Sequence, residues 1–177
     1  MKTITNKFSA VIIMIAAFIS GTSFGQTKLT DPEIASVAVT ANQIDINYAK
    51  IAKEKSKNAD ILKFANTMAT DHQSVIDQAV ALVTKLNVTP KDNDVSKSLN
   101  SQAEAMKKTL QTKSGNAFDK SYINNEVAYH KKVISTVQNV LIPQSQNAEL
   151  KALLEKVLPI LKTHLEHAEM VQKMFSK

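Results

Sequence analysis

The residues of this chain best suited to carry chemistry are three histidines, each at the centre of an apolar helical stripe. Around His72, His130 and His164 the apolar residues recur at steps of three and four, which is the spacing of one face of an α-helix. The stripes belong to three different predicted helices, so all three imidazoles should point into one helical core. Because a buried imidazole needs a hydrogen-bond partner or a metal ion, the pattern predicts a polar site inside that core.

Further side chains could complete a metal site with these histidines. Glu126 lies four residues before His130, and His167 lies three residues after His164, so each pair shares one helix face. Helical pairs with such spacings can chelate a transition metal. An imidazole-rich set without thiols suits zinc, copper, nickel or iron better than calcium or magnesium. The candidate metal ligands are His72, His130, His164, His167, Glu126 and Asp45.

The alternative is that these histidines are core residues whose hydrogen bonds are satisfied within the protein, and the sequence alone favours this interpretation. A standard di-iron carboxylate site is disfavoured, because it needs a glutamate three residues before a histidine. Ala69, Val127 and Leu161 occupy those positions. His167 lies at the edge of its stripe and is expected to be half-exposed. The hydrogen-bond partners expected for the inward histidines are Tyr48, Tyr122, Tyr129, Glu126 and Asp45.

Helical spacing of apolar residues runs through almost the whole chain, and signals for β-strands are absent. The residues Thr30-Asp31-Pro32-Glu33 form a capping box that should open the first helix. Pro159 should kink the last helix one turn before His164. The main helices are expected at about 31–56, 59–86, 117–141 and 146–175, with an amphipathic segment at about 95–110.

Loop lengths predict how these helices are connected. The first two and the last two main helices are joined by short loops, so each pair should be antiparallel, whereas 87–116 is long enough to travel the length of the bundle. We therefore expect an all-α, ferritin-like four-helix bundle with a long crossover carrying an extra short helix. This arrangement places His72 and His130 at similar heights. It places His164 about one and a half turns further toward the opposite end.

The first 25 residues have the pattern of a secretory signal peptide. Lys2 and Lys7 precede a short apolar segment, and Ser23-Phe24-Gly25 supplies small residues for cleavage before Gln26. We expect residues 1–25 to be removed and residues 26–177 to form one exported domain. The chain has no cysteine, which excludes a lipoprotein anchor on cysteine and any disulfide. The protein should therefore lie in the periplasm or at the outer membrane, with peripheral association to the membrane or to envelope proteins.

Charge and motifs limit the function classes. The formal net charge is +6, and every basic residue is lysine. The absence of arginine argues against sequence-specific nucleic-acid binding, because arginine supplies the bidentate contacts to bases and phosphates. Motifs for a cysteine nucleophile, a phosphate loop or a serine-hydrolase turn are also missing, so the sequence favours a protein that is not an enzyme.

Three segments of the sequence resemble signature blocks of one protein family. They are residues 64–72, which end in Asp71-His72, residues 115–122 together with His130, and residues 158–164. Taken together, over about residues 31–175, they resemble the domain-of-unknown-function family number four-one-four-two, whose members are often labelled outer membrane proteins.

The resemblance implies a ferritin-like helical fold and an exported, often envelope-associated protein, and it implies no particular activity. It also marks two departures, since Asp45 stands where the family tends to carry glutamate and Glu126 where an apolar or amide residue is usual. Two function classes therefore stay open. The favoured one is a non-catalytic structural or interaction module, and the alternative is a transition-metal-binding or redox protein that uses its core histidines.

Overall fold

The computed structural model describes residues 28–175, which contain helices and no strands. The predicted signal peptide, residues 1–25, lies outside the described residues. The helices are α1 (Asp31–Lys55), α2 (Ala59–Lys85), α3 (Asp94–Gln111), α4 (Gly115–Thr136), a π-helical turn η1 (Val137–Leu141), α5 (Ile142–Gln144) and α6 (Ala148–Met174). The all-α prediction is confirmed.

The starts of the helices follow from local capping. Glu33 of the predicted capping box accepts hydrogen bonds from the backbone N–H and the hydroxyl of Thr30, at 2.9 and 2.7 Å. Asparagine side chains accept from the first free N–H groups of three other helices, at Asn58 for α2, Asn93 for α3 and Asn147 for α6, whereas the N-cap of α4, Ser114, makes no such bond. These short polar signals in the sequence therefore fix where the long apolar stripes begin.

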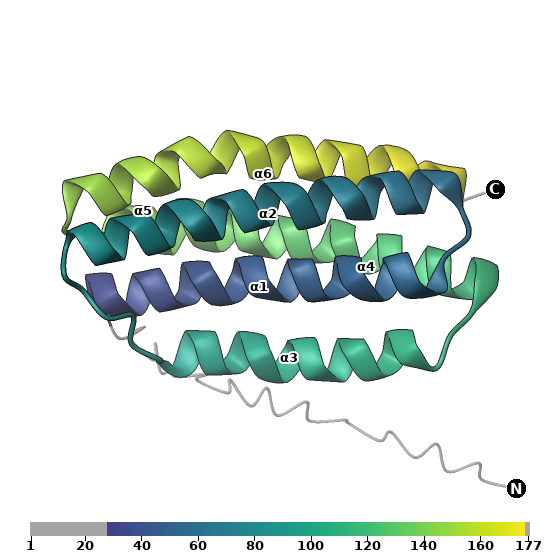
Figure 1. The fold of residues 1–177 in the computed structure, drawn as a ribbon, viewed down its shortest axis with the longest axis horizontal. Coiled ribbons are helices and arrows are strands. Elements are labelled where there is room, and N and C mark those ends of the chain that lie inside the picture. Colours follow the sequence, from purple (N-terminus) through teal and green to yellow (C-terminus); the bar gives the residue numbers. More distant parts are fainter. Residues whose placement is uncertain (1–27, 176–177) are drawn as a thin grey trace, which may run out of the picture.

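The long helices lie side by side, and their order along the chain sets their directions (Figure 1). Helix α1 runs antiparallel to α2, and α4 runs antiparallel to α6, whereas α2 and α4 run in the same direction. The connection between α2 and α4 contains α3, which packs mainly against α1 and lies on one side of the other helices. Residues from α1, α2, α4 and α6 can therefore meet along a common interior.

The end of the fourth helical segment differs from the prediction. A helix end was expected at Leu141 because Pro143 follows, but the helix continues through η1 and α5 to Gln144. In an α-helix, the ring of Pro143 would press against the carbonyl of the residue four positions before it. The wider π turn directly before the proline accommodates the ring, and the Ile142 N–H bonds instead to the Val137 carbonyl. Helix α6 also continues through Pro159 and is visibly arched (Figure 1).

The interior consists of two hydrophobic clusters with a polar layer between them. One cluster includes Tyr48, Phe64 and Tyr122, toward the loop that joins α1 and α2. The other includes Val37 and Leu154, toward the loop that joins α5 and α6. The buried polar side chains Asn42, His72, His130 and His164 lie between residues of the two clusters along α1, α2, α4 and α6. The hydrophobic core therefore surrounds the predicted polar site.

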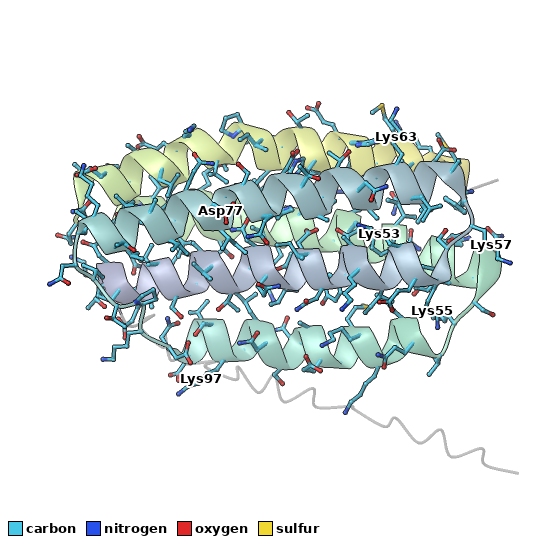
Figure 2. All side chains as sticks on the ribbon, in the orientation of Figure 1. Lys53, Lys55, Lys57, Lys63, Asp77 and Lys97 are labelled. Carbon is cyan, nitrogen blue, oxygen red and sulfur yellow. The ribbon has the colours of Figure 1, made fainter. Side chains whose placement is uncertain are left out.

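The lysines lie on the outside of the molecule. Lys53, Lys55 and Lys57 gather near the end of α1 (Figure 2), and Lys55 donates to the backbone carbonyl of Gln111. None of the described helices combines the length and the apolar character that a membrane-spanning segment requires.

Asp31 ties the beginning of α1 to the α5–α6 loop, and its removal should destabilise the fold. Its carboxylate oxygens accept from the backbone N–H groups of Gln146 and Asn147, at 2.8 and 2.9 Å. We expect Asp31→Ala to lower the free energy of unfolding by about 1–2 kcal/mol, because both N–H groups lose their partner. Urea unfolding measures the change. The control is Asp77→Ala, since Asp77 is exposed and, among the described residues, accepts only from Gln73 on its own helix. Equal effects of the two substitutions would contradict the role of Asp31.

Candidate metal centre

The three inward histidines meet in the middle of the bundle. His72 of α2, His130 of α4 and His164 of α6 are each 4% exposed or less. Their ring centroids are 5.7 Å apart for His72 and His130, 5.1 Å for His72 and His164, and 5.6 Å for His130 and His164. Asp45 of α1 is fully buried beside them. The prediction that the three imidazoles share one core is confirmed.

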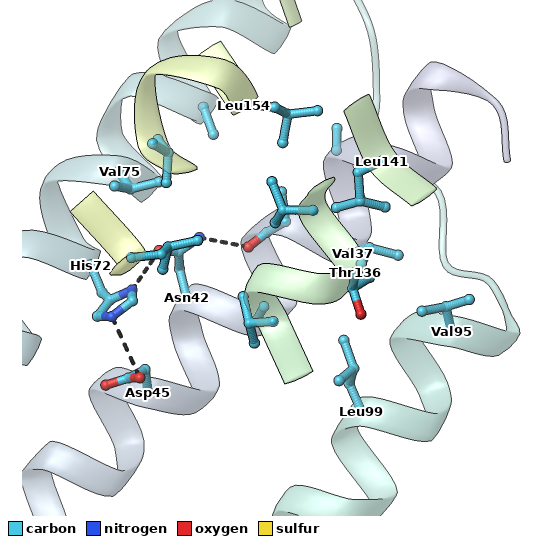
Figure 3. A pocket seen from close by; sticks show the side chains of 18 of the residues that line it. Val37, Asn42, Asp45, His72, Val75, Val95, Leu99, Thr136, Leu141 and Leu154 are labelled. Atoms are coloured by element: carbon cyan, nitrogen blue, oxygen red, sulfur yellow. Dashed lines mark hydrogen bonds and ion pairs between the residues drawn. The ribbon is translucent and has the colours of Figure 1, made fainter. Parts of the chain in front are cut away.

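His72 is held in one tautomer by Asn42. The Asn42 amide nitrogen donates to the carbonyl of Ala38 at 2.8 Å, so its oxygen is left to accept. His72 Nδ1 lies 2.7 Å from that oxygen and must carry the proton that it donates (Figure 3). His72 Nε2 therefore has a free lone pair, and it lies 3.4 Å from Asp45 Oδ2.

His130 and His164 are fixed in the same way by acceptors on their outer sides. His130 Nδ1 donates to the backbone carbonyl of Glu126 at 3.0 Å, which leaves the lone pair of Nε2 at 3.6 Å from Asp45 Oδ2. His164 Nε2 donates to Asp71 Oδ2 at 2.9 Å, which leaves the lone pair on Nδ1. An outer acceptor that fixes the imidazole tautomer is the arrangement that supports histidine ligands around metal ions.

The two buried carboxyl groups of the site accept no hydrogen bond. Neither oxygen of Asp45 or of Glu126 has a hydrogen-bond partner among the described residues, and both side chains are fully buried. Glu126 Oε2 lies 3.7 Å from His130 Nδ1. Burial raises the pKa of Glu126 well above its usual value, and the charge of Asp45 raises it further, against the opposing effect of the neighbouring Asn125 amide. Burial also raises the pKa of Asp45, against the opposing effect of His130.

The imidazoles are uncharged at neutral pH. Burial lowers the pKa of His72 to about 4. Burial also lowers the pKa of His130, although Asp45 opposes this, and that of His164, although the hydrogen bond that His164 donates to Asp71 opposes it. Neutral imidazole is the form that binds a metal, so no proton has to leave these rings before binding at neutral pH.

Together these groups form a set of electron-pair donors. His72 Nε2, His130 Nε2 and His164 Nδ1 receive no hydrogen bond from any described residue, and neither do the Asp45 oxygens. One ring nitrogen from each histidine lies within 4.8 Å of those of the other two, and Asp45, Glu126 and His130 form a second such group around the shared His130. Because each unpaired buried polar atom costs about 1–3 kcal/mol, a bound cation is the most direct way to satisfy them together.

His167 lies apart from this cluster. It is half-buried, as its place at the edge of the stripe predicted, and its ring packs edge-on against Phe64 with the centroids 5.1 Å apart. It belongs to neither of the groups of side chains with ligand spacing. The structure therefore brings five of the six candidate ligands together and separates His167 from them.

The hydrogen-bond partners differ in part from those expected. Asp45 and Glu126 contact the histidines, but the Tyr129 hydroxyl donates to the carbonyl of Ala41 instead. The sequence pattern did not predict Asn42 or Asp71 as hydrogen-bond partners of the rings. Asn42 lies three residues before Asp45 on α1, so helical spacing could have placed it on the same face.

Comparison with known proteins agrees with the motifs around these residues. The profile of a domain of unknown function, DUF4142, matches residues 20–171. The chain belongs to the DUF4142 family. Asp45, Glu126 and all four histidines lie within the matched part of this DUF4142 chain. No curated protein and no solved structure matches it.

The buried carboxyl of Glu126 leads to a prediction for the metal-free protein. In the unfolded chain Glu126 ionises near its usual pKa of 4.5, whereas burial raises the folded-state pKa. Rising pH above 4.5 therefore favours the unfolded chain, which releases its proton first. We expect Glu126→Gln, which cannot ionise, to become progressively more stable than the wild type as pH rises. Urea unfolding in chelator at pH 5 and pH 8 measures this difference. The control is Glu155→Gln, an exposed site on α6, and a pH-independent difference for Glu126→Gln would refute the prediction.

Proposed function

We propose that this DUF4142 protein binds one transition-metal ion through His72, His130, His164 and Asp45, with Glu126 beside them as a further oxygen ligand. The observation that carries the proposal is the set of three imidazole lone pairs, each fixed inward by an outer acceptor and each without a hydrogen bond. Neutral nitrogen ligands with one or two carboxylates suit zinc, copper, nickel or iron.

Metal binding explains this cluster better than a purely structural role does. A structural core gains no stability from buried acceptors that lack partners, and apolar residues of the same size would fill the space without that cost. Asp45 and Glu126 are the two carboxyl groups of the cluster. They are also the two positions at which this chain departs from the pattern that the family resemblance suggests. The non-catalytic structural or interaction module remains the competing function.

We also propose that the fold is ferritin-like and that the protein is exported. The ferritin-like assignment is supported by the helix directions, since α1–α2 and α4–α6 are antiparallel pairs and α2 and α4 run in the same direction. It is also supported by α3, which lies on the connection between the two pairs. Export, to the periplasm or the outer membrane, rests on the signal-peptide pattern of residues 1–25. Intact-mass analysis of protein from the native host tests it, since a chain that retains Met1 would contradict cleavage before Gln26.

Metal content tests the main proposal directly. The protein is purified from the native host without chelators, and its metals are quantified against protein concentration. The metal-free form is then titrated with Zn(II), Cu(II), Ni(II) and Fe(II). We expect one metal ion per chain and saturable binding of at least one of the four ions. Substoichiometric metal in the native protein, together with no saturable binding in titration, would end the proposal.

A further inference from the structure

A cavity of about 310 Å³ adjoins the histidine cluster on the side of the α5–α6 loop. Its walls come from α1, α2, α3, α4, η1 and α6, and most of the lining side chains are aliphatic. Figure 3 shows Val37, Val75 and Leu154 around this space, with His72 and Asp45 to one side. The cavity therefore combines an apolar chamber with one polar end.

The polar end presents acceptors. Asp45, His72 and His130 line the cavity, and the two Asp45 oxygens and both Nε2 atoms receive no hydrogen bond from the described residues. Protonation of Asp45 would not remove this excess, because one proton can satisfy only one of the two Nε2 atoms. Two hydroxyl groups on the wall already donate elsewhere, Tyr129 to the carbonyl of Ala41 and Thr136 to that of Lys132, and the third, on Ser98, is exposed.

The exposed part of the lining lies between α3 and α4. Ser98 and Gln102 of α3 and Lys132 of α4 are exposed lining residues. Lys132 Nζ donates to Gln102 Oε1 at 2.6 Å, so two flexible side chains bridge the helices at this point. The lining of the chamber therefore meets solvent between these two helices.

We propose that this cavity binds a small apolar molecule with one hydroxyl donor, of the class of alkylphenols, with its hydroxyl donating to one of the Asp45, His72 and His130 acceptors. The volume is about twice the ~150 Å³ of a cavity that takes up benzene, so a ring with a short alkyl chain fits. It is at the lower end of the range of ~300–1,000 Å³ that is usual for small-molecule sites. An apolar carboxylate suits the site less well, because its charge would face Asp45.

This inference goes beyond the proposed metal binding and does not depend on it. A donor hydroxyl satisfies one of the acceptors that the metal-free protein leaves unpaired, and the same oxygen is a suitable additional ligand when a metal ion is bound. The two proposals can therefore fail separately. Measurements on the metal-free protein test the cavity, and metal titration in the absence of phenol tests the ion site.

The test compares 4-propylphenol with propylbenzene, which has the same shape without the hydroxyl. Both are titrated into the metal-free full-length protein in chelator by calorimetry. We expect 4-propylphenol to bind one to one with a dissociation constant below about 1 mM. We expect propylbenzene to bind at least about tenfold more weakly, because it leaves buried acceptors unpaired. Equal affinities, or no saturation by 4-propylphenol, would overturn the proposal.

Variants locate the binding in the cavity. Val75→Phe adds a ring to the cavity wall, whereas Val80→Phe makes the same change at a valine of α2 that is 51% exposed. Both variants are checked for helix content by circular dichroism. We expect Val75→Phe to weaken phenol binding at least about tenfold and Val80→Phe to leave it unchanged. Asp45→Asn supplies an amide donor to the rings and should reduce the preference for 4-propylphenol over propylbenzene. Unchanged binding by Val75→Phe, or an unchanged preference in Asp45→Asn, would also overturn the inference.

Discussion

Zinc at a hundredfold excess over its dissociation constant is expected to raise the melting temperature of the metal-free protein by about 5–10 °C. Binding to the folded state alone stabilises it by about 2.7 kcal/mol at that excess, and each kcal/mol shifts the melting temperature of a domain of this size by about 2–4 °C. Removal of one imidazole by His164→Ala should abolish most of the shift, because the remaining ligands lose one of three nitrogens. Differential scanning calorimetry with and without zinc measures both values.

His167→Ala is the matched control for this experiment. His167 lies three residues further along α6 and is half-buried, but it is outside the cluster. Its variant should show the full zinc-induced shift. Copper, nickel and iron are tested in the same way. A melting curve of the wild type that responds neither to chelator nor to any of the four ions would refute metal stabilisation. In that case His164→Ala should still cost about 1–3 kcal/mol through the lost hydrogen bond and packing.

The metal-free protein is expected to lose the stability contributed by His72 as pH falls from 6.5 to 4. Burial lowers the pKa of His72 from 6.5 to about 4. Between these pH values the imidazole is protonated in the unfolded chain and remains neutral in the folded chain. The contribution is complete above pH 6.5 and is lost as pH falls toward 4. With about 1.4 kcal/mol per pKa unit, the loss amounts to about 3 kcal/mol.

A comparison with His72→Gln isolates this effect. Asp45 and Glu126 have raised pKa values and act in the opposite direction, but both proteins contain them. We therefore expect the difference in unfolding free energy between wild type and His72→Gln to shrink by about 3 kcal/mol between pH 7 and pH 4. Urea unfolding in chelator gives the two curves. Parallel curves over this range would mean that His72 titrates in the folded protein as it does in the unfolded chain.

The inward orientation of the three cluster histidines was predictable from the sequence pattern. Spacing at three and four placed His72, His130 and His164 on inward faces, and the structure buries all three. The reason is that helical periodicity is a local property, which each stripe carries by itself. Export and the ferritin-like classification remain predictions, since the residues that carry the signal-peptide pattern lie outside the described part of the chain.

The position of His164 along the bundle axis was predicted wrongly from the sequence. Loop lengths placed it about one and a half turns away from the other two rings, yet its ring lies 5.1 Å from His72 and 5.6 Å from His130. The expected helix end at Leu141 caused much of the error. The helix continues to Gln144 and includes a π turn, so the loop that joins it to α6 lies further from His130 than expected. A local change in backbone winding is not visible in the apolar pattern.

The sequence by itself determined the helices, their starts, the inward faces of the histidines and membership of the family, because each depends on short-range spacing or on motifs along the chain. Only the tertiary structure decided which nitrogen of each ring carries a free lone pair. That choice depends on Asn42 and Asp71, which contact His72 and His164 from other helices, and on the carbonyl of Glu126 beside His130. It also decided that His167 stays apart and that an apolar cavity ends at the cluster, since both depend on how helices distant in sequence pack together.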